Sequence, residues 1–548
     1  MSGAGRVARG AALVASHVLR ELRSSGALVV PLHWTDTPRA PPPPPSPAPR
    51  EAAAADAPPA ADTSPPPPLH ARTPPPPLDP PRVVEPWSPP AAAAAAPPPP
   101  PRTSASRSVP VHPLTRALHF GGLGLGLAAG AAAQAVRQAV GGGGGRLVMS
   151  EQNVEKLAGT LCRLRGAALK VGQMLSFNDA DVLPPAMQAA LERVRDGADW
   201  MPQEQLHRTL AAELGADWRS RLAEFDETPC AAASIGQVHR ALLPDGRAVA
   251  IKVQYPGVAD SIHSDLWSMK QLVSYTGLVP RGLFLDRVLE VAQKELLQEC
   301  DYEHEAASTR AFKRLLAPYP EFAVPAVVDA LSSQRVLTTE WMAGEPIDKA
   351  ARRMSPAERD RVGSRLLWLS LVELSRFRFM QTDPNWSNFL YERRTGQLSL
   401  IDFGACQSYD PWFADEYLRL VRACADGASR REEILRLSRS LGFLTGEESQ
   451  QMLDAHVSAA VLVGEPFAEG HQPFDFGRQD ISKRITGDVS TMLQHRLTPP
   501  REEIYTLHRR LNGCFQLAAR VEANIFARDI LLDVYNKHSW HVPEAEQA

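Results

Sequence analysis

Apolar residues recur with two different periods along the chain. Residues 153–171, 185–197 and 202–214 have the three- and four-residue spacing of amphipathic helices. Residues 248–253 (AVAIKV) alternate instead, as in a half-buried strand, with one lysine among the packing residues. Helical patterns then continue to the C-terminus, and Ser355-Pro356 marks the start of one of these helices. The order of helices, a small sheet and more helices predicts an α+β fold.

A second pair of strands is predicted later in the chain. Residues 389–391 and 398–401 are strand-like, and they flank Thr395-Gly396, which is typical of a turn. We therefore expect a β-hairpin whose second strand leads directly into Asp402.

The first 150 residues differ in composition from the rest. Residues 38–113 contain 30 of the chain's 50 prolines, often in runs mixed with alanine. Such a segment has few backbone donors and little apolar surface to bury, so we expect residues 36–115 to form an extended or disordered linker rich in proline and alanine. A proline-rich ligand for a partner domain is the alternative.

Residues 1–35 have the pattern of a targeting sequence. This stretch contains four arginines (Arg6, Arg9, Arg20 and Arg23) and only one acidic residue before residue 35, Glu21. The other residues around them, mainly Ala, Val and Leu, are compatible with a helix. This pattern is typical of a mitochondrial transit peptide. A secretory signal fits less well, because Arg20 and Glu21 interrupt the apolar run, and a tail without a targeting role is the other alternative.

Residues 116–137 are predicted to form a transmembrane helix. Twenty residues without formal charge lie between Arg116 and Arg137, and about 20 residues are needed to cross the core of a bilayer. The high glycine and alanine content makes this stretch weakly hydrophobic, so a soluble or membrane-surface helix is the alternative. A glycine-rich tether, residues 138–150, follows it.

Three glycines within this helix have a regular spacing. Gly122, Gly126 and Gly130 recur every four residues, which places small residues along one helix face. Such a face permits close packing of two helices, so we expect a possible homodimer contact there, although a glycine-rich stretch also produces this spacing by chance.

Charge and cysteine content exclude some classes of protein. The net charge of −3 argues against a general nucleic-acid binder, so no nucleic-acid partner is expected. The six cysteines lie far apart and form no C-x-x-C pair, which argues against a disulfide framework or a zinc ribbon. We therefore expect free thiols.

The candidate chemistry lies in four residues with a characteristic spacing. Lys252 sits in the predicted strand, Asp383 and Asn388 lie five residues apart in a predicted loop, and Asp402-Phe-Gly follows the predicted hairpin. Kinase-type sites use such a lysine on phosphates, such an Asp near the acceptor, and such an Asn and Asp on Mg²⁺. A second D-F-G at Asp475 has no catalytic loop before it, and we interpret it as a chance match.

Several parts of an ordinary protein kinase are missing. The sequence has the alanine-rich segment Ala231, Ala232, Ala233 and Ser234 where a glycine-rich loop would precede the lysine strand. Alanine side chains narrow the backbone freedom of that loop. Residues 380–382 (MQT) replace the usual His-Arg before the catalytic Asp, and no A-P-E follows Asp402. An ordinary protein kinase is therefore not expected.

These residues together resemble the UbiB-type (aarF-domain) family of atypical kinases, and most closely its animal mitochondrial members, which support coenzyme Q biosynthesis. The resemblance covers residues 115–540. Further motifs that carry it are K-x-G-Q at Lys170, Gly172 and Gln173, then Glu299, Asp301 and Glu305. It implies a two-lobe, protein-kinase-like fold with an N-terminal helical extension that carries K-x-G-Q (151–222), an N-lobe (223–343) and a C-lobe (344–540).

The resemblance also implies roles for single residues, with ATP and Mg²⁺ as cofactors. Lys252 would contact phosphates and pair with Glu305, Asp402 and Asn388 would hold Mg²⁺, and Asp383 would occupy the catalytic-base position. Nucleotide contacts are further implied for Ala231, Ala232, Ala233 and Ser234, and around the hinge for Glu340, Met342 and Ala343.

In this family the K-x-G-Q extension folds over the active site. The resemblance implies that Lys170 pairs with Glu299 and Asp301 and takes the space that a protein substrate would need. An isolated K-x-G-Q would by itself indicate only a solvated helix. Its occurrence together with Glu299 and Asp301 favours autoinhibition of phosphorylation in trans.

The first hypothesis for function is a kinase-like ATPase that supports coenzyme Q biosynthesis at the mitochondrial inner membrane and acts on or presents lipid precursors. Its expected partners are the other biosynthetic enzymes and membrane lipid, with the kinase-like part facing the matrix. Two alternatives stay open: a protein or small-molecule kinase, and a nucleotide-stabilised scaffold for the biosynthetic complex.

Overall fold

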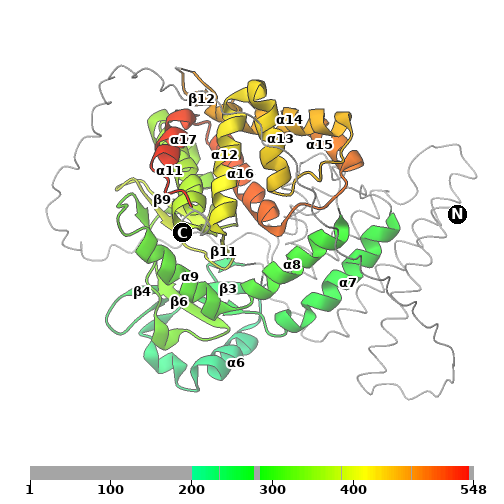
Figure 1. Cartoon of the computed structure of the whole chain (residues 1–548). Coiled ribbons are helices and arrows are strands. Elements are labelled where there is room, and N and C mark those ends of the chain that lie inside the picture. Colours follow the sequence, from blue (N-terminus) through cyan, green and yellow to red (C-terminus); the bar gives the residue numbers. More distant parts are fainter. Residues whose placement is uncertain are drawn as a thin grey trace, which may run out of the picture. The chain divides into compact units, whose positions relative to one another are not determined.

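The computed structural model describes residues 200–233, 235–276, 284–383, 385–470, 472–479 and 481–541, which all lie in one compact unit. The predicted transit peptide, proline-rich linker, membrane helix, glycine-rich tether and K-x-G-Q motif fall outside these residues. Among the helices that are described, none is both long enough and apolar enough to cross a bilayer. The described chain mixes sheets and helices, so the predicted α+β class is confirmed (Figure 1).

A five-stranded antiparallel sheet occupies the first half of the described chain. Its order is β1-β3-β4-β6, and β2 also pairs with β3. The strand predicted at residues 248–253 is confirmed as β4, where Val249, Ile251 and Val253 are buried and Lys252 points to the other face. The strands are β1 (Glu224–Phe225), β2 (Ala231–Ala232), β3 (Gly236–Leu242), β4 (Ala248–Gln254) and β6 (Val336–Glu340).

Helix α6 confirms the helix predicted at residues 202–214. Its buried residues Leu206, Leu210 and Leu214 recur every four positions and join the hydrophobic cluster that contains the buried face of β4. In Figure 1, α6 and α9 lie near this sheet in the lower half of the view. The helices of this half are α6 (Gln203–Leu214), α7 (Val258–Thr276), α8 (Leu285–Glu299) and α9 (Tyr302–Leu315).

A four-stranded sheet with the order β5-β10-β9-β7 begins the second half. The predicted hairpin is confirmed as β9 and β10, and Gly396 in its turn has φ of +70°, a conformation that favours glycine. Strand β5 comes before β6 in the chain but pairs in parallel with β10. The strands are β5 (Phe322–Ala323), β7 (Glu345–Pro346), β9 (Phe389–Glu392) and β10 (Gln397–Leu400).

Helix α11 begins where the sequence predicts. Ser355 accepts a hydrogen bond from the backbone of Glu358, and the Glu358 side chain accepts one from the backbone of Ser355, which forms a capping box. The helix ends in a π-helical turn, Glu373–Phe377, and residues after it form β8 (Phe379–Gln381), which pairs with β11 (Cys406–Ser408). This short ladder was not predicted.

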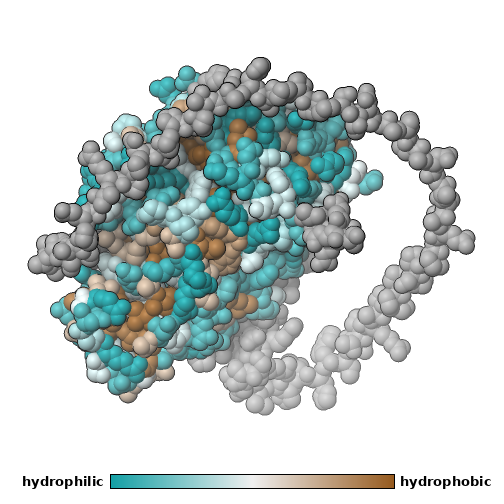
Figure 2. Space-filling view, turned by 60° about the vertical axis from the view of Figure 1, so that its left-hand side comes forward, coloured by the Kyte–Doolittle hydropathy of each residue, from teal (hydrophilic) through white to brown (hydrophobic). Residues whose placement is uncertain are grey.

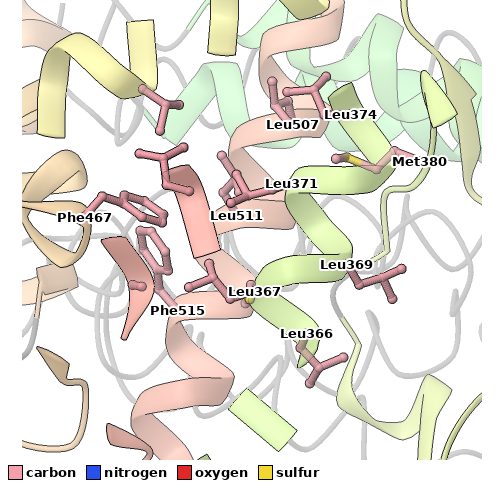
Figure 3. Close-up of a cluster of buried hydrophobic side chains, with 14 of the residues drawn as sticks. Leu366, Leu367, Leu369, Leu371, Leu374, Met380, Phe467, Leu507, Leu511 and Phe515 are labelled. Atoms are coloured by element: carbon pink, nitrogen blue, oxygen red, sulfur yellow. The ribbon is translucent and has the colours of Figure 1, made fainter. Parts of the chain in front are cut away.

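The other helices enclose the larger hydrophobic core. Figure 3 shows side chains of α11, such as Leu367 and Leu371, directed toward side chains of α16, such as Leu511 and Phe515. The remaining α-helices and strands are α10 (Ile347–Ala350), α12 (Pro411–Ala425), α13 (Arg431–Ser440), α14 (Gln450–Gly464), β12 (Phe474–Asp475), α15 (Ile481–His495), α16 (Glu502–Arg520), β13 (Asn524–Ile525) and α17 (Ala527–Asn536).

Some hydrophobic residues remain exposed at the surface, whereas most cysteines are buried. On the face in Figure 2, hydrophobic residues gather in patches between hydrophilic ones. One of the exposed large hydrophobic residues, Ile401, is the neighbour of Asp402 in the chain. The five cysteines in the described part of the chain are free thiols, as predicted, and four of them are buried.

Candidate functional site

Lys252 is at the centre of the site, held by two carboxylates. Its ammonium lies 2.8 Å from both carboxylate oxygens of Glu305 on α9 and 3.1 Å from Oδ2 of Asp402. The Glu305 side chain is only 2% exposed, whereas Asp402 is 29% exposed. The structure therefore brings together the strand lysine, its predicted helix partner and the aspartate of the D-F-G triplet, which are up to 150 residues apart in sequence.

Burial and charge act against each other at these groups. Burial by itself lowers the pKa of Lys252, but the charges of Asp402 and Glu305 outweigh it and raise that pKa well above its usual value. Burial raises the pKa of Glu305 to about 7 although Lys252 opposes this. One ammonium thus faces two carboxylates, and the excess negative charge favours a further cation at the site.

The backbone after β10 fixes the orientation of Asp402. Its Oδ1 accepts a hydrogen bond from the Gly404 backbone at 3.1 Å, while Oδ2 faces Lys252. Phe403 is fully buried, and the centre of its ring lies 4.9 Å from the centre of the Phe312 ring on α9. A Cβ on Gly404 would stand 3.4 Å from a carboxylate oxygen of Glu305. Phe403 and Gly404 of the triplet therefore lie against α9, the helix that carries Glu305.

Asp383 and Asn388 form one hydrogen-bonded loop. The Asn388 amide donates to Asp383 Oδ2 at 2.8 Å, and the Asp383 Oδ1 accepts from the Asn385 backbone at 3.2 Å. The Asn388 carbonyl accepts from the backbone of Ile401, the residue before Asp402. Since the Asn388 amide nitrogen donates to Asp383, the side-chain oxygen of Asn388 is the atom that could bind a metal.

Two connections that the sequence did not predict hold this loop against the D-F-G segment. Gln381 of β8 is paired with Cys406 of β11, and Thr382 bonds to the Ala405 carbonyl through both its backbone and its hydroxyl. The buried Arg509 of α16 donates to the Thr382 carbonyl at 3.3 Å. A three-residue strand gives too short an alternation to be recognised in a sequence.

Arg509 also joins the loop to helix α8. Its guanidinium makes two contacts of 3.0 Å with Glu295, and both side chains are at most 10% exposed. Charged residues in the amphipathic pattern of residues 502–520 would by themselves indicate a solvated face, so the role of Arg509 was missed. Arg509 thus links α16 both to Glu295 of α8 and to Thr382 of the loop.

The alanine-rich segment forms an edge strand of the sheet, separated from the Lys252 strand by β3. Ala231 pairs with Val238, which pairs with Lys252 on the following strand. The Ala233 backbone donates to the Gly236 carbonyl at 2.8 Å, which closes the tip of the β2–β3 hairpin. The predicted phosphate-contacting segment is thus in register with the lysine, whereas Ser234 lies outside the described residues.

Gly236 allows close packing at this hairpin. A Cβ there would lie 2.5 Å from the Val253 carbonyl oxygen and 2.8 Å from the hydroxyl of Tyr302. That buried hydroxyl has no hydrogen-bond partner in the described part of the structure, and the Lys252 ammonium lies 5.1 Å from the centre of the Tyr302 ring. Tyr302 was not predicted as a site residue.

We expect Gly236→Ala to destabilise the fold by about 1–3 kcal/mol, because the added methyl group overlaps a backbone oxygen that cannot move freely. Chemical denaturation would measure this loss. The matched control is Gly470→Ala, since a Cβ at Gly470 meets no atom within 4 Å. Equal stability of the two variants would contradict the close packing at Gly236.

The predicted hinge lies between the two sheets. Strand β6 ends at Glu340, and β7, which begins at Glu345, belongs to the other sheet. The Glu340 backbone N–H donates to Ala326, so this residue is engaged within the fold. The backbone N–H groups of Met342 and Ala343 have no such acceptor among the described residues.

The other predicted residues belong to different elements, and Glu299 is near enough for its charge to help raise the pKa of Glu305. Asp475 pairs with β13 and bonds to the backbone and side chain of Arg478, as expected for a chance D-F-G. Asp301 caps α9 by accepting from the His304 backbone at 3.0 Å, and Glu299 ends α8. Their predicted partner Lys170, with Gly172 and Gln173, lies outside the described residues.

The described side chains fit Mg²⁺ only together with a substrate. No group of three His, Cys, Asp or Glu residues that could hold a metal occurs in the described part of the chain. Asp402 and Asn388 instead offer one carboxylate and one amide oxygen. This donor set suits Mg²⁺, which commonly uses one or two carboxylates and completes its shell with phosphate oxygens and water.

Comparisons with known proteins agree with this geometry. Residues 193–433 match the family model described as the ABC1 atypical kinase-like domain. The Danio rerio protein named atypical kinase COQ8B, mitochondrial, is 45% identical over 439 residues, which are 79% of this chain and 70% of that protein. The Saccharomyces cerevisiae atypical kinase COQ8, mitochondrial, is 40% identical over 439 residues, 79% of this chain and 87% of that protein.

A solved structure is also similar. The complex of Rv3197 with erythromycin from Mycobacterium tuberculosis has 27% sequence identity and a TM-score of 0.49, and the match covers 70% of this chain and 96% of that one. The identity to the two COQ8 proteins extends over more than two thirds of each. Together with the matched domain, it shows that this chain belongs to the ABC1 atypical kinase-like family.

Proposed function

We propose that this protein is a mitochondrial kinase-like ATPase that binds Mg²⁺ and ATP and supports coenzyme Q biosynthesis by acting on or presenting lipid precursors at the inner membrane. The observation that carries the nucleotide part is the cluster of Lys252, Glu305 and Asp402. The pathway and compartment are supported by the family resemblance and by the relatives named mitochondrial COQ8 kinases.

The proposed chemistry follows from the charges of the site. Lys252, kept in its ammonium form by two carboxylates, contacts the α and β phosphates of ATP. Asp402 and Asn388 would hold Mg²⁺, which would supply positive charge to neutralise the phosphates. Asp383, oriented by Asn388 and the Asn385 backbone, accepts the proton of the attacking hydroxyl or water. The γ-phosphoryl group passes to that oxygen, and ADP leaves.

The acceptor is proposed from the segments around the site. The proposed pairing of Lys170 with Glu299 and Asp301 would cover the acceptor side and exclude a protein substrate. Water or a small lipid-derived acceptor then remains. The proposed membrane helix at residues 116–137, with a homodimer contact through Gly122, Gly126 and Gly130, would hold the site near lipid and near the other biosynthetic enzymes.

We expect Mg²⁺ and ATP together to raise the thermal stability of the full chain. A ligand that binds only the folded state at a hundredfold excess over Kd stabilises it by about 2.7 kcal/mol. Lys252→Ala should remove most of this shift, since it removes the phosphate contact. Arg436→Ala on the exposed face of α13 is the matched control. A full shift in Lys252→Ala, or none in wild type, would contradict the proposed site.

Two further measurements separate this proposal from its alternatives. Phosphate release without labelling of proteins or lipid precursors supports an ATPase, whereas acceptor labelling that depends on Asp402 supports a kinase. If Asp383→Asn keeps its abundance and partner binding and still restores quinone synthesis in cells that lack the protein, a scaffold is the better description.

A further inference from the structure

A cavity of about 230 Å³ lies in the helical half of the fold, outside the nucleotide site. Its wall is formed by α12, α14, α15 and α16 together with Leu371 at the end of α11. Four of its wall residues, Leu371, Phe467, Leu511 and Phe515, are labelled in Figure 3. An apolar cavity of ~150 Å³ already takes up benzene, so this one is large enough for a small organic ligand.

The wall is apolar except for a few side chains. His508 projects between the rings of Phe443 and Tyr417, whose centres lie 5.3 and 6.0 Å away, and its exposed surface belongs to the cavity wall. His456 bonds to Ser438 at 2.8 Å. Burial, with the nearby charge of Arg496, lowers the pKa of His456 to about 4. The His456 ring is therefore neutral at pH 7.

Arg496 is the single charged residue among the described residues that line the cavity. It follows the end of α15, and its buried Nε has no hydrogen-bond partner in the described structure. No carboxylate forms an ion pair with it there either. A guanidinium that is partly buried against apolar walls without an anion is unfavourable, so the site is electrostatically incomplete.

We propose that this cavity binds a small apolar carboxylic acid, with the carboxylate on Arg496 and the hydrocarbon body against α12, α14 and α16. One guanidinium matches one monoanion, whereas a phosphate dianion would leave a net negative charge between apolar walls. The cavity exceeds the ~150 Å³ that takes up benzene, so it has room for an acid whose hydrocarbon part is somewhat larger than six carbons.

The test is calorimetric titration of the full chain with octanoate and, as a probe of the same length without charge, octanol. Octanoate should bind wild type more tightly than octanol does. Arg496→Met should weaken octanoate binding about tenfold or more, the loss expected for a charge-assisted hydrogen bond, and leave octanol binding unchanged. The matched control is Arg436→Met, which removes an exposed arginine that does not line the cavity.

One further variant tests where the probes bind, and a melting measurement on Arg496→Met tests whether the arginine lacks a partner. Ala460→Leu places a larger side chain in the cavity and should abolish binding of both probes. Arg496→Met should melt at or above the wild-type temperature, because it removes a charge without a partner. Equal binding of octanoate by the Arg496 and Arg436 variants, no binding by wild type, retained binding by Ala460→Leu or a lowered melting temperature of Arg496→Met would each overturn the proposal.

Discussion

Replacing Asp402 with asparagine should lower ATP turnover about 100- to 1,000-fold, the effect typical of removing one group that stabilises transition-state charge. The substitution keeps the size of the side chain and its acceptor for the Gly404 backbone, but it removes the charge proposed to hold Mg²⁺. It also leaves Lys252 with one carboxylate, Glu305, so the pair stays neutral and the fold should persist. Phosphate release at saturating Mg²⁺ and ATP measures the effect.

The chain contains its own control for this experiment. Asp475 also begins a D-F-G triplet, and its side chain is 32% exposed against 29% for Asp402. Asp475→Asn therefore makes the same chemical change in the same local sequence and at a similar exposure. It should leave turnover unchanged. Wild-type turnover in Asp402→Asn, or an equal loss in both variants, would rule out the proposed role of Asp402.

Replacing Arg510 with methionine should destabilise the fold by about 3–5 kcal/mol at pH 8, the range found when a buried ion pair loses one partner. Arg510 lies 3.2 Å from Glu373 in the π-helical turn after α11, and the two side chains are 3% and 0% exposed. Methionine fills similar volume but leaves a buried carboxylate without a counterion. Denaturant unfolding followed by circular dichroism measures the loss.

The pH dependence of the stability of Arg510→Met distinguishes two causes of the loss: a buried carboxylate without a counterion, and poorer packing. Burial raises the pKa of Glu373 to about 7 even though Arg510 opposes this shift. Without Arg510 the folded-state pKa rises further above the usual value of the unfolded chain. The folded variant then binds the proton more tightly, so its stability is greatest at acid pH and falls as pH rises. We expect a smaller loss at pH 5 than at pH 8.

A surface pair provides the comparison for Arg510. Arg208 and Glu204 on α6 are in contact at 2.7 Å, but their side chains are 73% and 84% exposed. Arg208→Met should therefore cost less than about 1 kcal/mol at either pH. In addition, Arg510→Met combined with Glu373→Leu should recover much of the stability. A loss in Arg510→Met that does not change with pH would mean that packing, not charge, explains the effect.

The elements that the sequence predicted are those with a strong local signal. The alternation around Lys252, the turn at Gly396 and the Ser355 cap each depend on residues within one segment, and the structure confirms all three. Helix α6 was predicted for the same reason, because its buried leucines repeat every four residues. The order of the elements was enough to predict the fold class, because apolar residues recur with different spacings in strands and in helices.

The contacts that hold the site together depend on residues far apart in sequence. The β8–β11 ladder is three residues long, and Arg509, Arg510 and Tyr302 look like ordinary members of amphipathic helices. Only the packed helices bring Arg509 to Thr382 and leave Arg496 facing an apolar cavity. Burial removes the water around these arginines, so each of them either pairs with a carboxylate, as Arg509 and Arg510 do, or has no ion-pair partner in the described structure, as for Arg496.

The sequence by itself therefore determined the fold class, the order of the elements and the identity of Lys252, Asp383, Asn388 and Asp402 as the candidate site, because residue type and spacing along the chain carry that information. The tertiary structure alone decided which charges are buried and what each of them contacts. These properties arise when segments that are far apart in sequence pack together and exclude water. The pattern of residues within one segment therefore does not predict them.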